Sequence, residues 1–523
     1  MKTFALNDDN VVVVIGSGAG GGSLAHELAV QGVDVVCLEA GRHLDWQKDF
    51  ANDEWEMFGR TAWLDKRTTS GNWRVAQDFP NLPAWICKTV GGTTVHWAGA
   101  SLRFQDHEFR AKTHYGEVDG ANLLDWPLTL KELEPYYDKA EDKLGVTRTH
   151  GIEGLPGNNN YKVFAAGAKR LGYKNVHTGR MAINSVARDG RAACRQLGFC
   201  FQGCRMGAKW STLYSEIPKA AKTDHFELRS EATVVHITHN SAGAVDGVVY
   251  VDKSGNQQKQ KARVVCVAGN SYESPRLLLH SASAKYPDGL ANSSGQVGRN
   301  YMRHTTGSVY AIFDNPVNMF RGTTMAGICT DEAKHDPSRG FVGGYELETL
   351  ALGIPFMAAF LNPGGWGHAF ADMMDGFDHM AGMWIVGEDM PQEQNGVTLH
   401  PTEKDAHGVP IPNVHFDDHP NDTAMRNHAF ARGTAIYDAV GAKKAIETPP
   451  YPSTHNLGTN RMSANARDGV VNKWGQTHDI PNLFVSDGSQ FTTGASENPT
   501  LTIVALAIRQ ADYLAGELKA KNL

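Results

Sequence analysis

Three closely spaced cysteines are the first feature of this sequence that suggests chemistry. Cys194, Cys200 and Cys204 lie within eleven residues, whereas the other four of the seven cysteines are scattered. Thiolates are the preferred ligands of iron–sulfur clusters, and a glycine-containing loop with three thiols can wrap around one. A zinc site is disfavoured because no nearby Cys or His pair completes a tetrahedron. Free buried thiols are the remaining interpretation.

A glycine-rich turn near the N-terminus predicts a nucleotide site. Gly16, Gly18 and Gly21 form a GxGxxG motif between a β-branched run and a helical pattern. The first glycine permits a tight turn, the second lets the backbone approach a pyrophosphate, and the third permits close helix–strand packing. Glu39 ends the next strand, where a carboxylate can accept the ribose hydroxyls. The motif fits FAD and NAD alike, and its extreme N-terminal position together with Glu39 favours FAD.

Two polar side chains near the C-terminal end could act on a substrate. His455 lies in a polar loop, and an imidazole with the usual pKa of about 6.5 can be neutral and accept a hydroxyl proton. Asn498 precedes Pro499 and Thr500, where a helix is expected to begin because proline suits the first helical turn. The first N–H groups of that helix could stabilise negative charge on a flavin. With 22 histidines in the chain, only the pairing with Asn498 favours a catalytic role for His455.

A second glycine-rich segment, VGGTTVHWAGAS, contains Gly91, Gly92 and His96. The ordinary interpretation is a turn that happens to contain a histidine. The functional interpretation is a loop that lies along a flavin, with His96 near the dimethylbenzene edge.

The elements that must position these residues follow an α/β order. Val11 to Ile15 and Val33 to Leu38 are apolar runs typical of strands buried on both faces, and Ser23 to Gln31 between them has helical spacing. These three segments predict a βαβ unit. Ala262 to Gly269 predicts another buried strand, and a long amphipathic helix from about Pro499 closes the chain.

This order predicts a discontinuous nucleotide-binding domain with a second domain inserted into it. Residues 1–310 and 455–523 are assigned to the nucleotide-binding domain, which includes the cysteine loop 194–212. Residues 311–454 are rich in Met, Phe, Trp, Gly and His and are assigned to a substrate-binding domain.

The bulk composition excludes several classes of protein. The chain has 523 residues, 20% charged residues and a net charge of −7, which gives no reason to expect nucleic acid as a partner. No run of apolar residues is long enough to span a bilayer, and the first residues do not resemble a signal peptide. The uneven cysteine spacing does not predict a disulfide framework.

The chain resembles the glucose–methanol–choline (GMC) oxidoreductase family over essentially its whole length. The resemblance rests on the glycine turn with Glu39, VGGTTVHWAG, AGNSYESPRLLLHS, VGRNYMRH and the closing pair His455 and Asn498. It implies FAD as cofactor, His455 as catalytic base and Asn498 as a ligand of the substrate oxygen. It also implies that Asp487 and Gly488 contact the FAD phosphate and ribose, and Val235 is included among the expected FAD contacts. The implied fold is α/β: a Rossmann-like FAD-binding domain with an inserted antiparallel-sheet substrate domain.

The cysteine run sets the chain apart from most GMC oxidases. It resembles the iron–sulfur segment of bacterial sugar dehydrogenases of this family, the FAD glucose, fructose, gluconate 2- and glucoside 3-dehydrogenases. In those enzymes, cysteines spaced C-x5-C-x3-C hold a [3Fe–4S] cluster, and Cys194, Cys200 and Cys204 keep that spacing. A [4Fe–4S] cluster would require a fourth ligand, and Leu197 stands where some relatives carry a cysteine.

The resemblance implies a dehydrogenase that oxidises a hydroxyl of a sugar or polyol and passes electrons through the cluster to a cytochrome c-type or quinone-linked acceptor. A small helper subunit is expected, with a membrane reached only through a partner. A signal-bearing partner would place the enzyme in the bacterial periplasm or on the periplasmic face of the inner membrane; without one, it would stay in the cytoplasm. Two alternatives remain open, an oxidase that uses molecular oxygen and a lyase that retains FAD without redox chemistry.

Overall fold

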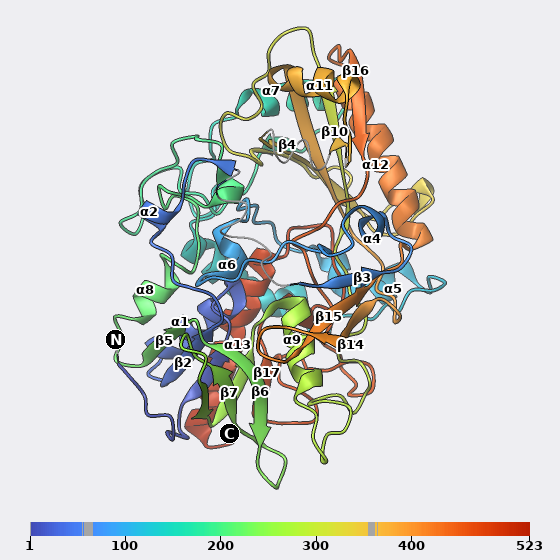
Figure 1. Cartoon of the computed structure of the whole chain (residues 1–523). Coiled ribbons are helices and arrows are strands. Elements are labelled where there is room, and N and C mark those ends of the chain that lie inside the picture. Colours follow the sequence, from blue (N-terminus) through green and yellow to red (C-terminus); the bar gives the residue numbers. More distant parts are fainter. Residues whose placement is uncertain (1, 55, 57–65, 354–360, 363) are drawn as a thin grey trace.

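Two sheets of different kind organise the chain in the computed structural model. The structure describes residues 2–54, 56, 66–353, 361–362 and 364–523. Figure 1 shows a parallel sheet in the lower half of the molecule, near both termini, and an antiparallel sheet in the upper half. This arrangement confirms the predicted α/β fold class with an antiparallel second region.

The parallel sheet has the strand order β17-β9-β1-β2-β5. Its members are β1 (Val12–Ile15), β2 (Val35–Glu39), β5 (Phe226–Ser230), β9 (Val264–Val267) and β17 (Leu483–Val485). Both β1 and β2 are fully buried, as expected for parallel strands that are covered on two faces. β17, from the C-terminal part of the chain, pairs with β9, so both the N-terminal and the C-terminal parts of the chain contribute strands to this sheet.

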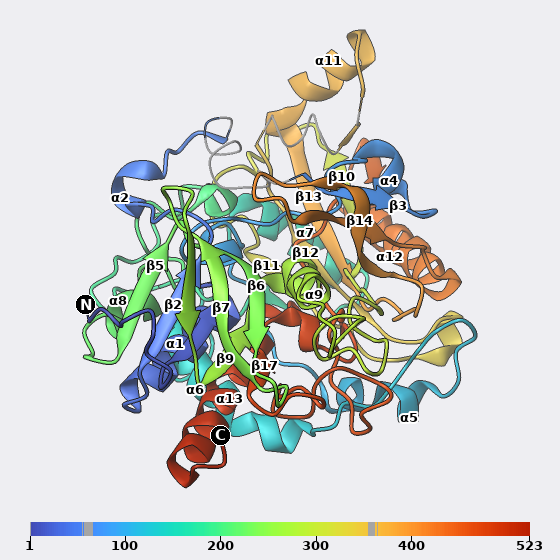
Figure 2. The same cartoon turned by 60° about the horizontal axis from the view of Figure 1, so that its bottom comes forward.

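Helices complete the layer around this sheet. They are α1 (Ala19–Val30), α6 (Leu130–Leu144), α8 (Glu216–Ala220), α9 (Asn270–His280) and α13 (Thr500–Ala520). Helix α13 packs against α1 and α6 (Figure 2). The predicted βαβ unit is confirmed, but α1 begins four residues earlier than the hydrophobic pattern indicated. Its first turns contain glycines, which form helices poorly, and close packing selects them here: a Cβ at Gly20 would lie 1.7 Å from the carbonyl oxygen of Ser486.

The antiparallel sheet has the order β16-β10-β13-β12-β11-β4. Its strands are β4 (Val176–Thr178), β10 (Thr305–Ile312), β11 (Gly327–Cys329), β12 (Tyr345–Thr349), β13 (Met380–Gly387) and β16 (Lys444–Thr448). Helices α7 (Asn159–Arg170) and α12 (Pro420–Asp438) pack on it. Thus β4, α7 and the start of β10 come from the segment that the sequence assigned to the nucleotide-binding domain. A three-residue strand such as β4 has no periodicity that would reveal its sheet.

Smaller elements connect the two halves. The remaining strands are β3 (Thr68–Ser70), β6 (Thr233–His239), β7 (Val245–Val251), β8 (Gln257–Lys261), β14 (Gly396–Lys404) and β15 (Pro410–His415). The remaining α-helices are α2 (Trp46–Asp49), α4 (Arg74–Asp78), α5 (Ala111–Tyr115) and α11 (His368–Asp375). Short 3-10 turns occur at η1 (Gly92–Val95), η2 (Asp106–Arg110), η3 (Cys200–Gln202), η4 (Pro337–Arg339), η5 (Phe377–His379) and η6 (Gly488–Gln490).

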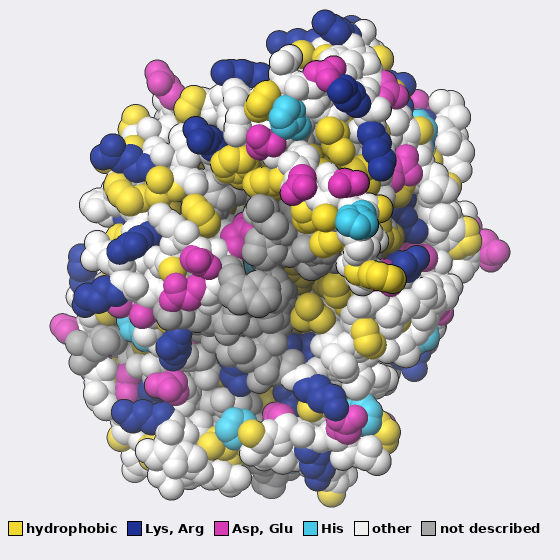
Figure 3. Space-filling model, turned by 45° about the horizontal axis from the view of Figure 1, so that its top comes forward, with side chains coloured by type: hydrophobic (Ala, Val, Ile, Leu, Met, Phe, Trp, Pro, Cys, Tyr) yellow, Lys and Arg dark blue, Asp and Glu magenta, His cyan; other side chains and the backbone are white. Residues whose placement is uncertain are grey.

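The surface shows mixed charge. On the face in Figure 3, basic and acidic side chains are interspersed with hydrophobic ones, and neither sign forms a large patch. Across the described residues, no helix combines the length and apolar character that crossing a membrane requires.

Candidate active site

The glycine turn after β1 has the geometry of a nucleotide cradle. Gly16 has a φ of +99°, and a Cβ there would lie 2.4 Å from the carbonyl oxygen of Ala268. A Cβ at Gly21 would lie 2.1 Å from the carbonyl oxygen of Gly16. At Gly18 the nearest atom is the Cα of Gly92, 3.9 Å away, so this side of the turn is open. Gly16 and Gly21 therefore serve the fold, and Gly18 leaves room for a bound group, as FAD requires.

One cavity collects most of the residues predicted for cofactor and substrate. Gly21 and Gly91 lie outside its lining, where they shape the turns behind it. The predicted residues that line the cavity are Gly16, Gly18, Glu39, Gly92, His96, Val235, His455, Asp487, Gly488, Asn498, Pro499 and Thr500. Folding has thus brought together segments from both ends of the chain.

Two buried carboxylates anchor the cofactor end of the cavity. Glu39 accepts hydrogen bonds from Ser17 N at 3.0 Å, Ser17 Oγ at 2.7 Å and Gly41 N at 2.8 Å. Burial raises the pKa of Glu39, and these hydrogen bonds oppose that effect. Oε2 accepts both hydrogen bonds from Ser17, whereas Oε1 accepts only the one from Gly41 and keeps a lone pair that a ribose hydroxyl can use. Asp487 accepts from Asn270 N at 2.8 Å and Ser489 N at 2.8 Å, so it holds η6 against the start of α9.

His455 is held by a second histidine. Nε2 of His304 lies 2.9 Å from the carbonyl oxygen of Gly494, which can only accept, so this nitrogen has the proton. His304 Nδ1 is therefore an acceptor, and His455 Nδ1, 2.9 Å away, donates to it. This leaves Nε2 of His455 unprotonated. Burial lowers the pKa of His304 to about 4, and burial together with His304 holds the pKa of His455 well below its usual value. The pair is neutral, and His455 is prepared to accept a proton.

Asn498 lies at the start of α13, as the sequence predicted. Its Nδ2 is 3.4 Å from Oε2 of Glu348, and its Oδ1 is buried without a partner. Pro499 precedes the first helical residue, and Pro499 and Thr500 both line the cavity. The unpaired N–H groups and the positive end of a 21-residue helix therefore adjoin the cavity beside Asn498.

The loop with His96 lies between the cavity and the cysteines. The Nε2 atom of His96 is buried and has no hydrogen-bond partner among the described residues. Burial, reinforced by the nearby Lys209, lowers the pKa of His96 to about 3, so its ring is neutral. The buried Nζ of Lys209 donates to the carbonyl oxygens of Val95 at 2.9 Å and Cys200 at 2.6 Å. Lys209 therefore ties the His96 loop to the cysteine loop.

The three cysteines lie in one loop, half-buried and free. Cys194 Sγ accepts from Gln196 N at 3.4 Å, and Cys204 Sγ accepts from Lys209 N at 3.5 Å. Burial raises the pKa of Cys194 to about 11, and the two other thiols add to the rise, so the three lie near one another. Backbone N–H groups that point at sulfur suit thiolate ligands of a cluster. Phe201 in this loop lines the cavity and packs against Trp85 with ring centroids 6.5 Å apart.

The sulfur atoms of the cysteine loop are not grouped closely enough for a single metal ion. Three potential ligand atoms approach within 4.8 Å of one another only at Asp138, Glu141 and His150 among these residues. A single zinc ion would need its sulfur ligands that close, because Zn–S bonds are about 2.3 Å long. A multi-iron cluster spaces its thiolates further apart, since each binds a different iron. As they lie in this structure, the three thiols are therefore too far apart to hold a single zinc ion.

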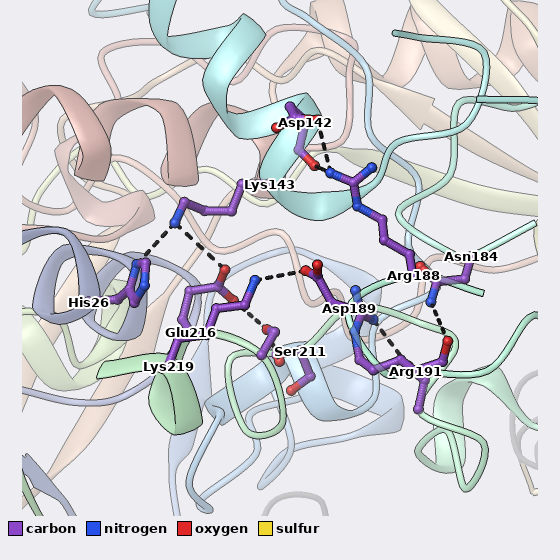
Figure 4. Close-up of polar contacts among 12 residues, drawn as sticks. His26, Asp142, Lys143, Asn184, Arg188, Asp189, Arg191, Ser211, Glu216 and Lys219 are labelled. Carbon is purple, nitrogen blue, oxygen red and sulfur yellow. Dashed lines mark hydrogen bonds and ion pairs between the residues drawn. The ribbon is translucent and has the colours of Figure 1, made fainter. Parts of the chain in front are cut away.

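The segment before the cysteine loop is anchored to neighbouring helices (Figure 4). Arg188 donates to Asp142 of α6 at 2.9 Å, and Lys219 of α8 donates to Asp189 at 2.7 Å. Arg191 Nη1 donates to the carbonyl oxygen of Gly207 at 3.1 Å and closes the base of the loop. These contacts attach the segment before the thiols to helices α6 and α8.

Sequence reasoning missed three residues of this site. His304 ends the segment VGRNYMRH, which had contributed to the family resemblance but had been given no role. Trp384 lines the cavity and packs on His455 at a centroid distance of 5.2 Å, and Glu348 contacts Asn498. Nothing in the spacing of Trp384 and Glu348 signals these contacts, because both lie in strands that are buried along their whole length.

Comparison with known proteins agrees with this geometry. Two family models described as GMC oxidoreductase match residues 19–306 and 391–507. The chain is 33% identical to 2-methyl-1,2-propanediol dehydrogenase of Mycolicibacterium austroafricanum, over 97% of this chain and 95% of that one. It is 28% identical to the fructose dehydrogenase large subunit of Gluconobacter japonicus, over 97% and 98%. A formate oxidase of Aspergillus oryzae shares the fold, with a TM-score of 0.68 at 15% identity over 98% and 100%.

Proposed function

Because the chain belongs to the GMC oxidoreductase family, a family of FAD-dependent enzymes, we propose that it is a dehydrogenase that oxidises a hydroxyl of a sugar, glycoside or polyol. The observation that supports this most directly is the unprotonated Nε2 of His455 in the same cavity as Asn498 and the glycine cradle. The named activities of the two relatives, on a diol and on fructose, support a hydroxyl compound as substrate.

The residues that line the cavity have separate roles in alcohol oxidation. The glycine turn, Glu39 and the start of α13 would hold FAD, and bound FAD would supply the hydride acceptor. His455 Nε2 accepts the hydroxyl proton, while the hydrogen bond from His455 Nδ1 to His304 keeps the ring in place. Asn498 binds the same oxygen and fixes its orientation. Trp384, Leu350 and Leu352 line the cavity and exclude water from the reacting atoms.

Electron transfer is the second part of the proposal. Cys194, Cys200 and Cys204 hold a [3Fe–4S] cluster, and no fourth thiol lies in this loop. A cluster held there would supply one-electron transfer to a cytochrome c-type or quinone-linked acceptor. A relative named as a large subunit supports a partner subunit here. We further propose that a signal-bearing helper subunit brings the enzyme to the periplasm.

Replacement of His455 tests the catalytic assignment. His455→Ala should bind FAD normally and lower the rate of flavin reduction by substrate by about 100-fold or more, because the proton acceptor is lost. The measurement is anaerobic stopped-flow absorbance with a panel of sugars and polyols. Near-normal reduction in the variant would refute the assignment. Reduction of the wild-type flavin by none of the hydroxyl compounds would refute the substrate class and favour the lyase alternative.

A further inference from the structure

Five glutamates are buried together beside the catalytic pair. They come from four separate segments: Glu346 and Glu348 from β12, Glu388 from the residue after β13, Glu108 from η2, and Glu497 from the residue before Asn498. Their exposed fractions do not exceed 2%. Since an isolated buried carboxylate is very costly, this group, the glutamate cluster, requires a physical explanation.

Hydrogen bonds link the members of the glutamate cluster. Ser496 Oγ lies 3.1 Å from Oε1 of Glu108 and 3.2 Å from Oε2 of Glu497, so it bridges the two. Glu346 and Glu348 are two residues apart on one strand and therefore share a face. Glu346 also lies close enough to Glu108 and Glu497 for their charges to repel.

The cluster lacks the partners that would stabilise five negative charges. Both oxygens of Glu346 and one oxygen each of Glu348 and Glu388 are buried without a hydrogen bond. Among the described residues, no Lys or Arg forms an ion pair with any of the five. No three of the five bring oxygens close enough to bind one ion.

Protons are the remaining way to neutralise the cluster. Burial raises the pKa of Glu348 and of Glu388 to about 8, with Glu108 adding to the rise at Glu388. Burial and the neighbouring carboxylates raise the pKa of Glu346 and Glu497 well above the usual value. Unpaired oxygens between protonated acids are positions where ordered water can bridge and protons can pass.

The cluster has one end at the catalytic site and the other near the surface. At the first end Glu348 contacts Asn498, and its cross-strand neighbour Trp384 packs on His455. At the second end Tyr115 donates to Glu388 at 2.8 Å. The ring centroid of Tyr115 lies 4.8 Å from that of His335 and 6.4 Å from that of His107. The ring of His107 in turn packs against the ring of the exposed His114.

Alcohol oxidation requires a route by which protons leave the active site. Conversion of an alcohol to a carbonyl compound releases two electrons and two protons in total. The electrons pass to the one-electron acceptor, and both protons must reach solvent. The inference rests on the proposed function, because that reaction is the source of the protons. We propose that the glutamate cluster stores these protons and conducts them from the Asn498 end to the histidines beside Tyr115.

The experiment compares Glu346→Gln and Glu497→Gln with Glu447→Gln in the FAD-loaded enzyme. Glutamine keeps the size of the side chain but cannot exchange a proton, and Glu447 is an exposed glutamate of the same antiparallel sheet. Infrared difference spectra are recorded between the oxidised enzyme and the enzyme reduced by dithionite. We expect a carbonyl band of a protonated carboxylic acid in the wild type and in Glu447→Gln, and its loss or shift in the two cluster variants.

A kinetic measurement tests conduction. Reoxidation of the dithionite-reduced enzyme by ferricyanide should slow about tenfold in the cluster variants, with a larger solvent isotope effect. An infrared band that is absent from the wild type, or unchanged in both cluster variants, would overturn the proposal, and so would an unchanged reoxidation rate. If one variant does not fold, the other decides. Dithionite requires no substrate, so a wrong substrate class would leave these results unaffected.

Discussion

At the scale of single residues, His304 determines what His455 can do. Because His304 donates from Nε2 to a backbone carbonyl, it presents a lone pair to His455 and fixes the tautomer that leaves the catalytic nitrogen free. His304 is thus a positioning residue, since it acts through His455.

Replacement of His304 should change the chemistry more than substrate binding. In His304→Ala, His455 can rotate and change tautomer, so kcat should fall about tenfold or more while KM changes little. The pH profile of flavin reduction should also shift, because the pKa of His455 no longer responds to His304. Equal losses in kcat and FAD content would indicate instead that His304 only supports the fold.

At the scale of elements, β12 places two acids where a strand of the core would normally have apolar side chains. All five residues of β12 are buried, and Glu346 and Glu348 face the start of α13 from this strand. The strand positions Asn498 through Glu348, and the helix presents its free N–H groups to the cavity. The site therefore depends on how these two elements meet.

The pH dependence of stability should reveal the buried acids of β12. Burial raises the pKa of Glu348 from 4.5 in the unfolded chain to about 8, so the folded state binds more protons between these values. The free energy of unfolding must therefore fall as pH rises from about 4.5 to about 8. The slope for this one group is about 1.4 kcal/mol per pH unit, so the whole loss amounts to a few kcal/mol. In Glu348→Gln this loss should be smaller, and melting temperatures between pH 5 and about pH 9 measure it. The control Glu447→Gln should follow the wild type.

At the scale of the whole molecule, the cavity and the cysteine loop are neighbours. The loop reaches the cavity through Phe201, and Lys209 joins it to the His96 loop. The segment before the loop is fastened to α6 and α8 (Figure 4), and the three cysteines pack against the hydrophobic core of the antiparallel sheet. The half-buried cysteines thus belong to a loop that also lines the cavity.

Replacement of Cys200 separates the two halves of the proposed reaction. Cys200→Ser should lose most of its iron and at least about 90% of its turnover with cytochrome c, while substrate still reduces the flavin in a single turnover. Iron analysis and stopped-flow absorbance provide the two measurements. Wild-type enzyme without iron, active with molecular oxygen, would contradict the dehydrogenase proposal in favour of the oxidase. Loss of flavin reduction as well would mean that the loop is needed for folding.

The sequence by itself determined the features that depend on local patterns. The glycines of the turn, the strand and helix around it and the helix start after Pro499 follow from residue type and spacing, because steric limits on the backbone act between near neighbours. His455 and Asn498, which the sequence predicts to act together on the substrate, both line the same cavity. The family resemblance added the α/β fold, and comparison confirmed it.

Only the tertiary structure decided which distant side chains meet. His304 and His455 are 151 residues apart in sequence, and Glu348 and Asn498 are 150 apart. The glutamate cluster joins β12, η2 and the start of α13, and no periodicity within one segment reports such a meeting. Burial and hydrogen bonding across segments set the tautomer of His455 and the protonation of the buried acids. These properties arise from packing, which the order of residues specifies only through the complete fold.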